Sequence, residues 1–423
     1  MSVVDLPKPN TEFPKLTVPN GLGTGPIPIA PYISQAWYEQ ERDRVFGRAW
    51  LCMGRVEQLP EADSFMVKEI EICGVIALIT RDAKDQIRAF HNVCSHRANL
   101  VVHETSGKGS RFVCKYHNWA YRNTGDCIGV PDRANFFDLD MKKCGLTPIA
   151  CETWEGWIFI NLQKQPEVTL TEFLGNFGEA FRDAPAPAAT QAFTVDVTSM
   201  RANWKVTIDA FCESYHVPVL HPSTLGDTFA NDSNRYARPL SGNVRGAHRT
   251  MTTFGNPNYL PPESSLIERL AYSNIDTGNT LGANDAADMQ ALQNHPAINP
   301  NKVPNWATEI CWLFPNFLIF YSPGGFFTLE FWPLSVNTTR WVARMHTPVA
   351  ADVRQRFQQE HYSCRMAEIF LEDVGNLERQ QKAMESGGKS EIILQDGEFL
   401  LRHSIETIQK WVASATVREA LAE

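Results

Sequence analysis

The chain has 423 residues, of which 43% are hydrophobic and 21% are charged, and its formal net charge is −9. This length favours two domains, and the composition is that of an ordinary globular protein. The acidic balance argues against nucleic acid as a partner.

The first part of the chain combines a helical segment with a β-rich region. Residues Ser34 to Phe46 place Trp37 and Val45 where they can share one side of a helix. Short runs of β-forming residues then follow one another, at 64–70, 75–80, 87–91 and 157–161. We therefore expect a small β-rich domain over residues 48–163, inserted near the N-terminus.

The remainder of the chain alternates between strands and helices. We expect a linker at 184–188, a strand at 193–200, a helix at 203–215, an irregular stretch at 224–305 with a helical patch near 285–293, an antiparallel meander at 308–347 and a long amphipathic helix at 351–386. Strands followed by helices indicate an α+β fold. Residues 1–47 and 164–423 are predicted to form the second domain. Part of 224–305 is predicted to be a mobile lid, because loops of this length are usually functional.

No membrane-spanning segment is expected. Residues 311–329 carry no charge and almost reach the length needed to cross a bilayer, but Pro315, Pro323 and Gly324 interrupt them. We interpret this segment as two buried strands joined by a turn. The first 21 residues lack the basic start and apolar run of a secretory signal. The ten cysteines show no secreted spacing pattern, so we expect a cytoplasmic protein without a membrane partner.

Two cysteine–histidine pairs are the most informative motif. Cys94 and His96 form one pair, and Cys114 and His117 form the other. In a Rieske [2Fe–2S] cluster, two cysteines bind one iron and two histidines bind the other. A structural zinc site is the alternative reading of a Cys₂His₂ set, although zinc fingers usually separate the cysteines from the histidines. We expect Cys94, His96, Cys114 and His117 to bind a Rieske cluster.

Two further histidines, His216 and His221, indicate a second metal site. If residues 203–216 are helical, Asp209, Glu213 and His216 lie near one another at helical spacing. The prolines that follow His216 must bend or end that helix, so His221 can turn back towards His216. Taken alone, such a histidine pair is more often an ordinary pair of surface or core residues.

The third ligand is expected to be a carboxylate. Asp373 falls on the apolar stripe of the long C-terminal helix, four residues from both Ile369 and Leu377. An ionised group on a core face is costly unless it is paired or bound to a metal. Glu372 points about 100° away and is expected to stay in water. With the two histidines, Asp373 would complete the 2-His-1-carboxylate face of a non-haem Fe(II) oxygenase; a salt-bridged aspartate is the alternative.

These motifs resemble those of the catalytic alpha subunits of Rieske non-haem iron ring-hydroxylating oxygenases. Segments 89–97 and 114–119 are similar to the two cluster loops, and Glu213-x-Tyr215-His216-x₄-His221 is followed by Glu372-Asp373 in the family's order. The family commonly has proline and glycine at four loop positions that are occupied here by Ser95, Lys115, Ala98 and Asn118. All four cluster ligands are intact, and the resemblance covers nearly the whole chain.

The resemblance implies a β-rich Rieske domain and a helix-grip catalytic domain with an antiparallel sheet. It implies a terminal oxygenase component that uses O₂ and NAD(P)H-derived electrons to mono- or dioxygenate, or to dealkylate, a small apolar and aromatic substrate. The cofactors would be a Rieske [2Fe–2S] cluster and a mononuclear Fe(II). The sequence contains no glycine-rich dinucleotide loop, so a separate NAD(P)H-dependent reductase, with or without a ferredoxin, would supply the electrons.

Glu213 is the catalytic residue that the resemblance singles out. Many family members carry aspartate at this position, where it bridges a Rieske histidine of one subunit and an iron-ligand histidine of the next. The resemblance therefore implies a homotrimer. Whether a small beta subunit is also present stays open. Phe211, Val217 and Ile369 lie near ligand positions by spacing and are predicted to line an apolar pocket.

Two other functions compete with this interpretation. The first is a non-catalytic Rieske electron carrier whose second site is empty. The second is a zinc-stabilised helix-grip binding module. Total iron separates the first from an oxygenase, and a colourless protein that contains zinc would favour the second.

Overall fold

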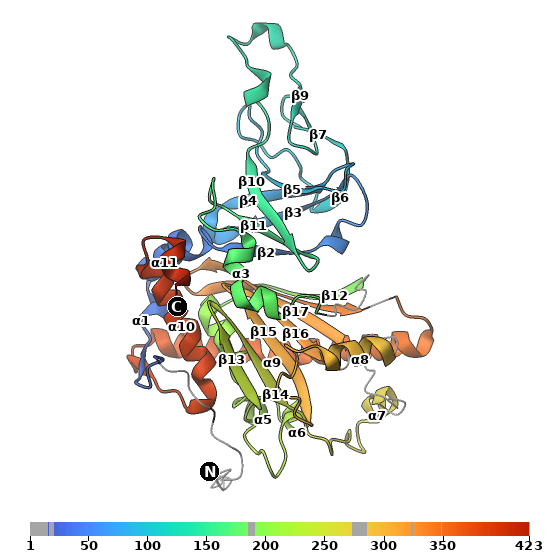
Figure 1. Ribbon diagram of the computed structural model, residues 1–423, viewed down its shortest axis with the longest axis vertical. Helices are drawn as coiled ribbons and strands as arrows, with labels where there is room; N and C mark the ends of the chain where they lie inside the picture. The colour runs from blue at the N-terminus through green and yellow to red at the C-terminus, as the bar shows by residue number, and fades with distance from the viewer. Residues whose placement is uncertain are drawn as a thin grey trace. The chain divides into compact units, whose positions relative to one another are not determined.

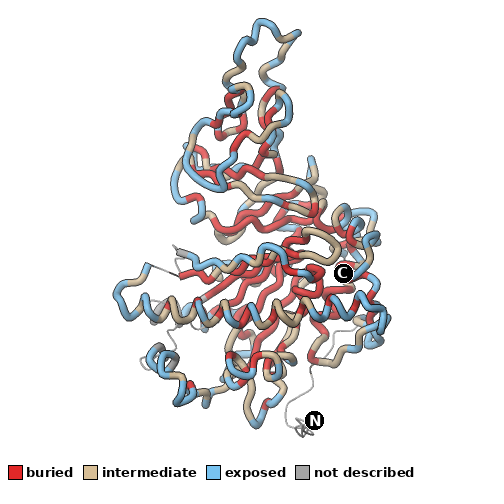
Figure 2. Tube along the Cα trace, turned by 180° about the vertical axis from the view of Figure 1, so that it is seen from behind, coloured by how far each residue is buried: buried red, intermediate tan, exposed pale blue. Residues whose placement is uncertain are grey.

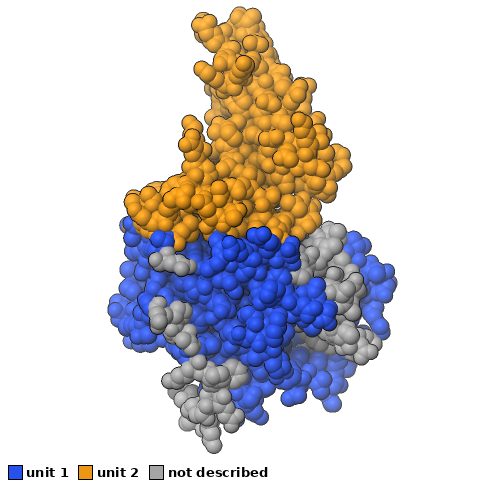
Figure 3. Space-filling view, viewed as in Figure 1, with its two compact units in different colours: residues 1–38, 175–413, 422–423 blue, residues 39–174, 414–421 orange. Residues whose placement is uncertain are grey.

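A computed structural model describes residue 16 and residues 21–184, 191–272, 286–322, 325–347 and 349–422. The described chain divides into two compact units, which Figure 3 distinguishes by colour. The N-terminal unit comprises residues 39–174 together with 414–421. The C-terminal unit comprises the described residues of 1–38 and 175–413, with residue 422. The predicted domain boundaries at residues 48 and 163 stay a prediction, and the linker expected at 184–188 falls largely outside the described residues.

The N-terminal unit is built on antiparallel sheets, as its alternating sequence predicts (Figure 1). Its larger sheet has the strand order β2-β11-β10-β5-β4-β3-β6, and a smaller one has the order β7-β8-β9. The strands are β2 Trp50–Arg55, β3 Ser64–Ile70, β4 Val75–Arg81, β5 Ile87–His91, β6 Ser106–Lys108, β7 Arg111–Val113, β8 Ala120–Arg122, β9 Cys127–Gly129, β10 Pro148–Trp154 and β11 Trp157–Asn161. An apolar cluster that includes Phe90, Phe112 and Trp119 surrounds Cys94 and Cys114.

The C-terminal unit contains a seven-stranded antiparallel sheet of order β12-β18-β17-β16-β15-β14-β13. Its strands are β12 Gln191–Met200, β13 Ser241–Arg245, β14 His248–Phe254, β15 Trp306–Leu313, β16 Phe317–Ser322, β17 Gly325–Ser335 and β18 Thr338–Thr347. Strands β14 and β16 are buried along almost their whole length, so both faces of the sheet are covered (Figure 2). A two-stranded ribbon pairs β1 Ile27–Pro28 with β19 Glu391–Ile392.

Short helices connect these strands, and a long one covers the larger C-terminal sheet. The α-helices are α1 Ala30–Ile33, α2 Gln35–Glu41, α3 Leu170–Ala180, α4 Trp204–Asp209, α5 Val217–Leu220, α6 Gly226–Phe229, α7 Leu266–Tyr272, α8 Ala286–Asn294, α9 Val353–Glu385, α10 Phe399–Ala413 and α11 Val417–Leu421. A π-helical turn spans Arg42–Phe46, and 3₁₀ turns span Val56–Gln58, Glu71–Cys73, Arg133–Asn135, Met141–Lys143 and Asp396–Glu398. No helix among the described residues is both long and apolar enough to cross a membrane.

Helix α9 carries the apolar stripe that the sequence predicts. Asp352 caps its N-terminus, where the carboxylate accepts a hydrogen bond from the amide of Gln355 at 2.8 Å. The buried positions that follow include Ile369, Asp373 and Leu377, which recur every four residues. The helix lies across one face of the seven-stranded sheet (Figures 1 and 2). Asp373 therefore faces the interior, as its place on the stripe predicts.

Three expectations about the C-terminal unit were wrong. Helix α4 ends at Asp209 rather than Tyr215, because the amides of Phe211 and Cys212 bond to carbonyls three residues earlier and close a tighter turn. Residues 224–305 are not one irregular stretch, since 241–254 supplies β13 and β14 of the sheet. Residues 311–329 run through three strands instead of two. Residues 273–285 of the expected lid lie outside the described residues.

Candidate metal centres and substrate pocket

The two cysteine–histidine loops are built to the same local plan. The amide of Ala98 bonds to the carbonyl of Cys94, and the amide of Asn118 bonds to the carbonyl of Cys114, both at 3.0 Å. Ala98 and Asn118 adopt left-handed backbone conformations, with φ of 55° and 56°. Glycine reaches this region without steric cost, which gives a physical reason why the related family favours glycine at both positions. Both loops therefore present their cysteine and histidine from one tight turn.

The loop side chains fit an iron–sulfur cluster. Both cysteines are buried, and the rings of His96 and His117 lie with their centroids 4.5 Å apart. Among the described side chains, Nδ1 of His96 is buried without a hydrogen-bond partner, as expected of a nitrogen that binds a metal. Burial raises the pKa of the Cys114 thiol, but hydrogen bonds from the backbone of Tyr116 and from neighbouring groups outweigh it, and the pKa lies below its ordinary value. The loop thus favours the thiolate that a metal requires.

Tyr121, in β8, is a further loop contact that sequence reasoning missed. Its hydroxyl accepts a hydrogen bond from the amide of Ser95 at 3.0 Å and lies 3.2 Å from Sγ of Cys94. Because the hydroxyl has a donor in Ser95, its own proton is available to the sulfur. Tyr121 lies only four residues after His117. This closeness to the second cluster loop in the sequence is the signal that could have identified it.

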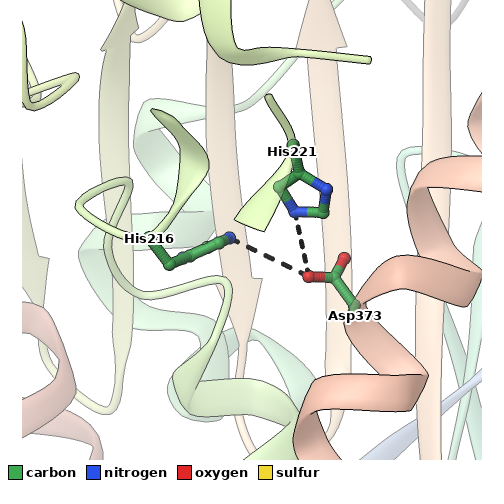
Figure 4. A group of neighbouring side chains, drawn as sticks. All are labelled: His216, His221 and Asp373. Carbon is green, nitrogen blue, oxygen red and sulfur yellow. Dashed lines mark hydrogen bonds and ion pairs between the residues drawn. The ribbon is translucent and has the colours of Figure 1, made fainter. Parts of the chain in front are cut away.

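His216, His221 and Asp373 come together in the C-terminal unit. His216 and His221 flank the single turn of α5, and Asp373 approaches from α9 (Figure 4). Oδ1 of Asp373 lies 3.1 Å from Nε2 of His221 and 3.9 Å from Nε2 of His216. Two atoms that each bind one ion at about 2.1 Å lie roughly 3–4 Å apart. The three side chains thus fit one metal ion, and one ligand atom from each lies within 4.8 Å of those of the other two.

Two glutamates hold the opposite nitrogens of the same histidines. A carboxylate oxygen of Glu213 bonds to Nδ1 of His216 across a short turn. Glu372 bonds to Nδ1 of His221 at 2.6 Å and accepts a hydrogen bond from the Thr224 hydroxyl at 2.7 Å. Each carboxylate favours a proton on Nδ1, which leaves the Nε2 lone pair facing the metal position.

The sequence places Glu372 away from Asp373, where it can stay in water, and the structure adds that it bonds to His221. Its side chain is only 27% exposed. The helix does turn the side chain of Glu372 away from that of Asp373, but the ring of His221 lies between the two carboxylates. Glu372 therefore contacts Nδ1 of this ring and Asp373 contacts Nε2. The prolines also act differently from the expectation, since Pro218 is the second residue of α5 and lies within its first turn, where a proline is tolerated.

The carboxylates also control the charge of the imidazoles. Burial lowers the pKa of His216, but the charge of Glu213 outweighs burial and raises the pKa above its ordinary value. Burial likewise lowers the pKa of His221, and Asp373 and Glu372 together raise it. This arrangement suits a bound cation, because a divalent ion can take the place of the protons in neutralising the carboxylates.

A cavity of about 900 Å³ extends from these residues. Phe211, Val217 and Ile369 lie on its wall, together with Phe320 and Phe327 of the sheet. Other aromatic residues of the meander, such as Phe331, pack into the core beside it. The wall is mainly apolar and aromatic near the metal position. The cavity lies wholly within the C-terminal unit.

The sequence and structure are similar to known oxygenases. Residues 187–414 match the family model of the ring hydroxylating alpha subunit (catalytic domain), and residues 49–149 match the Rieske [2Fe-2S] domain. Chloroplastic choline monooxygenase of Spinacia oleracea is 32% identical over 198 residues, which cover 46% of this chain and 44% of that protein. The alpha subunit of N,N-dimethyl phenylurea N-demethylase of Sphingobium sp. is 30% identical over 299 residues, covering 69% and 64%.

The fold is also similar to that of a solved dioxygenase. Naphthalene 1,2-dioxygenase from Rhodococcus sp. bound to indole superposes with a TM-score of 0.70 at 20% identity, covering 92% of this chain and 95% of that one. The chain spans about half the length of most curated relatives it matches. The catalytic-domain match alone covers more than half of the chain, so this protein belongs to the ring-hydroxylating alpha subunit family.

Proposed function

We propose that this chain is the terminal oxygenase component of a Rieske system, which uses O₂ and NAD(P)H-derived electrons to oxygenate or dealkylate an organic substrate. One observation supports it most strongly: the same chain carries both the paired cysteine–histidine loops and a 2-His-1-carboxylate group that opens onto a cavity of about 900 Å³. An electron carrier has no use for the second site or for the cavity.

Cys94 and Cys114 would hold one iron of the cluster, and His96 and His117 would hold the other. His216, His221 and Asp373 would hold the mononuclear iron. When bound, the cluster supplies electrons one at a time and the mononuclear iron supplies the centre at which O₂ is activated. The protein's own contribution is orientation, because Glu213 and Glu372 fix both imidazole rings and the apolar wall keeps water away from the substrate.

We further propose that Glu213 links neighbouring subunits of a homotrimer. The side chains of Glu213 and His216 keep 11% and 24% of their surface exposed in the isolated chain, so neither is fully buried. A glutamate that already bonds one imidazole has a second oxygen with which it can accept a hydrogen bond from another. A reductase, with or without a ferredoxin, would deliver electrons to the cluster. The free cysteines support a reducing compartment, and we infer the cytoplasm.

Iron counting in two variants tests this proposal. The wild-type protein is expected to bind three irons per chain, to be red-brown and to form an oxygenated product with reductase, NADH and substrate. Asp373→Ala is expected to lose one iron and all turnover while it keeps the cluster absorbance. Cys114→Ala is expected to lose the cluster absorbance. Two irons in the wild type would instead support the electron carrier, and a colourless zinc protein would support the binding module.

The bridging role of Glu213 has a separate test. Glu213→Gln removes the charged acceptor while it keeps the length of the side chain, so iron and substrate binding are expected to remain and electron transfer to slow. Single-turnover kinetics measure this step directly. A near wild-type rate, or a monomer that turns over normally, would contradict the bridge.

A further inference from the structure

The segment between β9 and β10 carries two consecutive phenylalanines that lie in opposite environments. Residues 130–147 leave the smaller sheet after β9 and return to the larger sheet at β10 (Figure 1). Phe136 packs against the apolar cluster around the two cysteine ligands, whereas Phe137 is 99% exposed. A 3₁₀ turn fixes this arrangement, because the amide of Phe136 donates a hydrogen bond to the carbonyl of Arg133 at 3.1 Å. Of the two rings, only that of Phe136 therefore covers the iron–sulfur site.

The ring of Phe136 lies against the imidazole of His96. The two ring centroids are 5.8 Å apart at an interplanar angle of 76°, which is an edge-to-face contact. Trp119 stacks on the same imidazole, with centroids 5.2 Å apart and an interplanar angle of 4°. Trp119 also meets Phe136 edge to face at 5.6 Å. The three rings thus pack together, and two aromatic side chains border His96 in addition to His117.

The aromatic neighbours of the two histidines differ in their own burial. The neighbours of His96 are Trp119, which is buried, and Phe136, which is partly buried. The neighbour of His117 is Tyr116, whose ring centroid lies 3.8 Å away and which is 53% exposed. Both imidazoles keep part of their surface exposed. The apolar ring of Phe136 therefore limits how closely water approaches the imidazole of His96.

We propose that Phe136 is a positioning residue that keeps water from the His96 side of the iron–sulfur cluster and thereby lowers the reduction potential of the cluster. With two ferric ions, two sulfides, two thiolates and two neutral imidazoles, an oxidised Rieske cluster has no net charge, and reduction by one electron gives it one negative charge. Water stabilises this added charge, so the exclusion of water disfavours the reduced form. A lower potential makes the reduced cluster a stronger electron donor. The proposal rests on the cluster assigned to this chain as part of its proposed function.

The reduction potential of the full chain with its cluster bound tests the proposal without turnover. Phe136→Ala is expected to shift the equilibrium between the cluster and a redox dye about three- to tenfold towards the reduced cluster, a rise in potential of about 30–60 mV for one electron. Phe136→Leu keeps an apolar side chain of intermediate volume and is expected to give a smaller rise. Phe137→Ala is the matched control, because it removes the neighbouring exposed ring, and it is expected to leave the potential unchanged.

Deuterium signals measure the access of water to the cluster independently of the potential. After the protein is exchanged into D₂O, pulsed electron paramagnetic resonance of the reduced cluster detects the deuterons that lie near it. The deuterium signal is expected to be larger in Phe136→Ala than in the wild type. In Phe137→Ala it is expected to match the wild type, since that ring is not in contact with the described cluster loops.

An unchanged or lower potential in Phe136→Ala overturns the proposal, and so does a deuterium signal that does not increase. The proposal is also overturned if Phe137→Ala raises the potential as much as Phe136→Ala does, because the effect would then not depend on the contact with His96. If Phe136→Ala does not retain the cluster, Phe136→Leu carries the same test with its smaller rise. A wild-type protein without the absorbance of the cluster would instead refute the cluster assignment, so the two failures are distinguishable.

Discussion

Glu372 is expected to raise the affinity of the mononuclear site for its metal ion, although it is not itself a ligand, because it orients the ring of His221. The perturbation is Glu372→Gln, which keeps the shape of the side chain and removes its charge. The native carboxylate bonds to Nδ1 of His221 at 2.6 Å and is only 27% exposed, so solvent screens it weakly. A hydrogen bond to a charged group contributes about 1.5–3 kcal/mol, which is about 10- to 100-fold in metal affinity. Glutamine can still accept one hydrogen bond, so the lower half of that range is expected.

The assay is an anaerobic titration of the iron-depleted mononuclear site with Co(II) against a chelator, with cluster absorbance as the measure of an intact fold. Glu368→Gln is the matched control, because Glu368 is exposed on the same helix one turn earlier. Asp373→Asn should abolish binding in the same assay. An affinity of Glu372→Gln within twofold of both the wild type and Glu368→Gln would show that the contact does not orient His221, and the reasoning would be refuted.

Three further predictions concern the cluster loops and the core. Tyr121→Phe removes the hydroxyl that lies 3.2 Å from Sγ of Cys94 and should lower the cluster's reduction potential by some tens of millivolts, because a hydrogen bond of about 1–2 kcal/mol corresponds to that range. Protein-film voltammetry measures this shift, and an unchanged potential would contradict the contact. Ala98→Gly relieves a φ of 55° and should stabilise the protein by about 1 kcal/mol in denaturant unfolding, whereas a loss of stability would mean that the turn is not strained. Burial raises the pKa of Asp209 from its ordinary value near 3.8 to about 7, so its neutral form stabilises the fold fully below about pH 4, and this contribution is lost as the pH rises through 7. Asp209→Asn should therefore flatten the fall in Tm between pH 5 and 8, and an equally steep fall in the variant would exclude Asp209 as its cause.

Much of the architecture was predictable because it depends on local patterns. The cysteine and histidine of each cluster loop lie two or three residues apart, so one turn brings them together whatever surrounds it. The strands at 64–70 and 87–91 follow from alternation and β-propensity, and both coincide with β3 and β5. The phase of α9 follows from its apolar repeat, which placed Asp373 on the buried face. A period is a local property, so it can be read along the chain.

Contacts between distant segments required the tertiary structure. Glu372 and His221 are 151 positions apart, and nothing in either local sequence states that the ring of His221 lies between two adjacent carboxylates. Arg365 of α9 likewise donates a hydrogen bond to the carbonyl of Thr224, which lies 141 positions away in the sequence. Helix α4 ended early although its sequence continues with residues compatible with a helix, because the chain must turn to bring His216 to α9. Side-chain chemistry and period are encoded locally, whereas the partner of a side chain depends on how the whole chain packs.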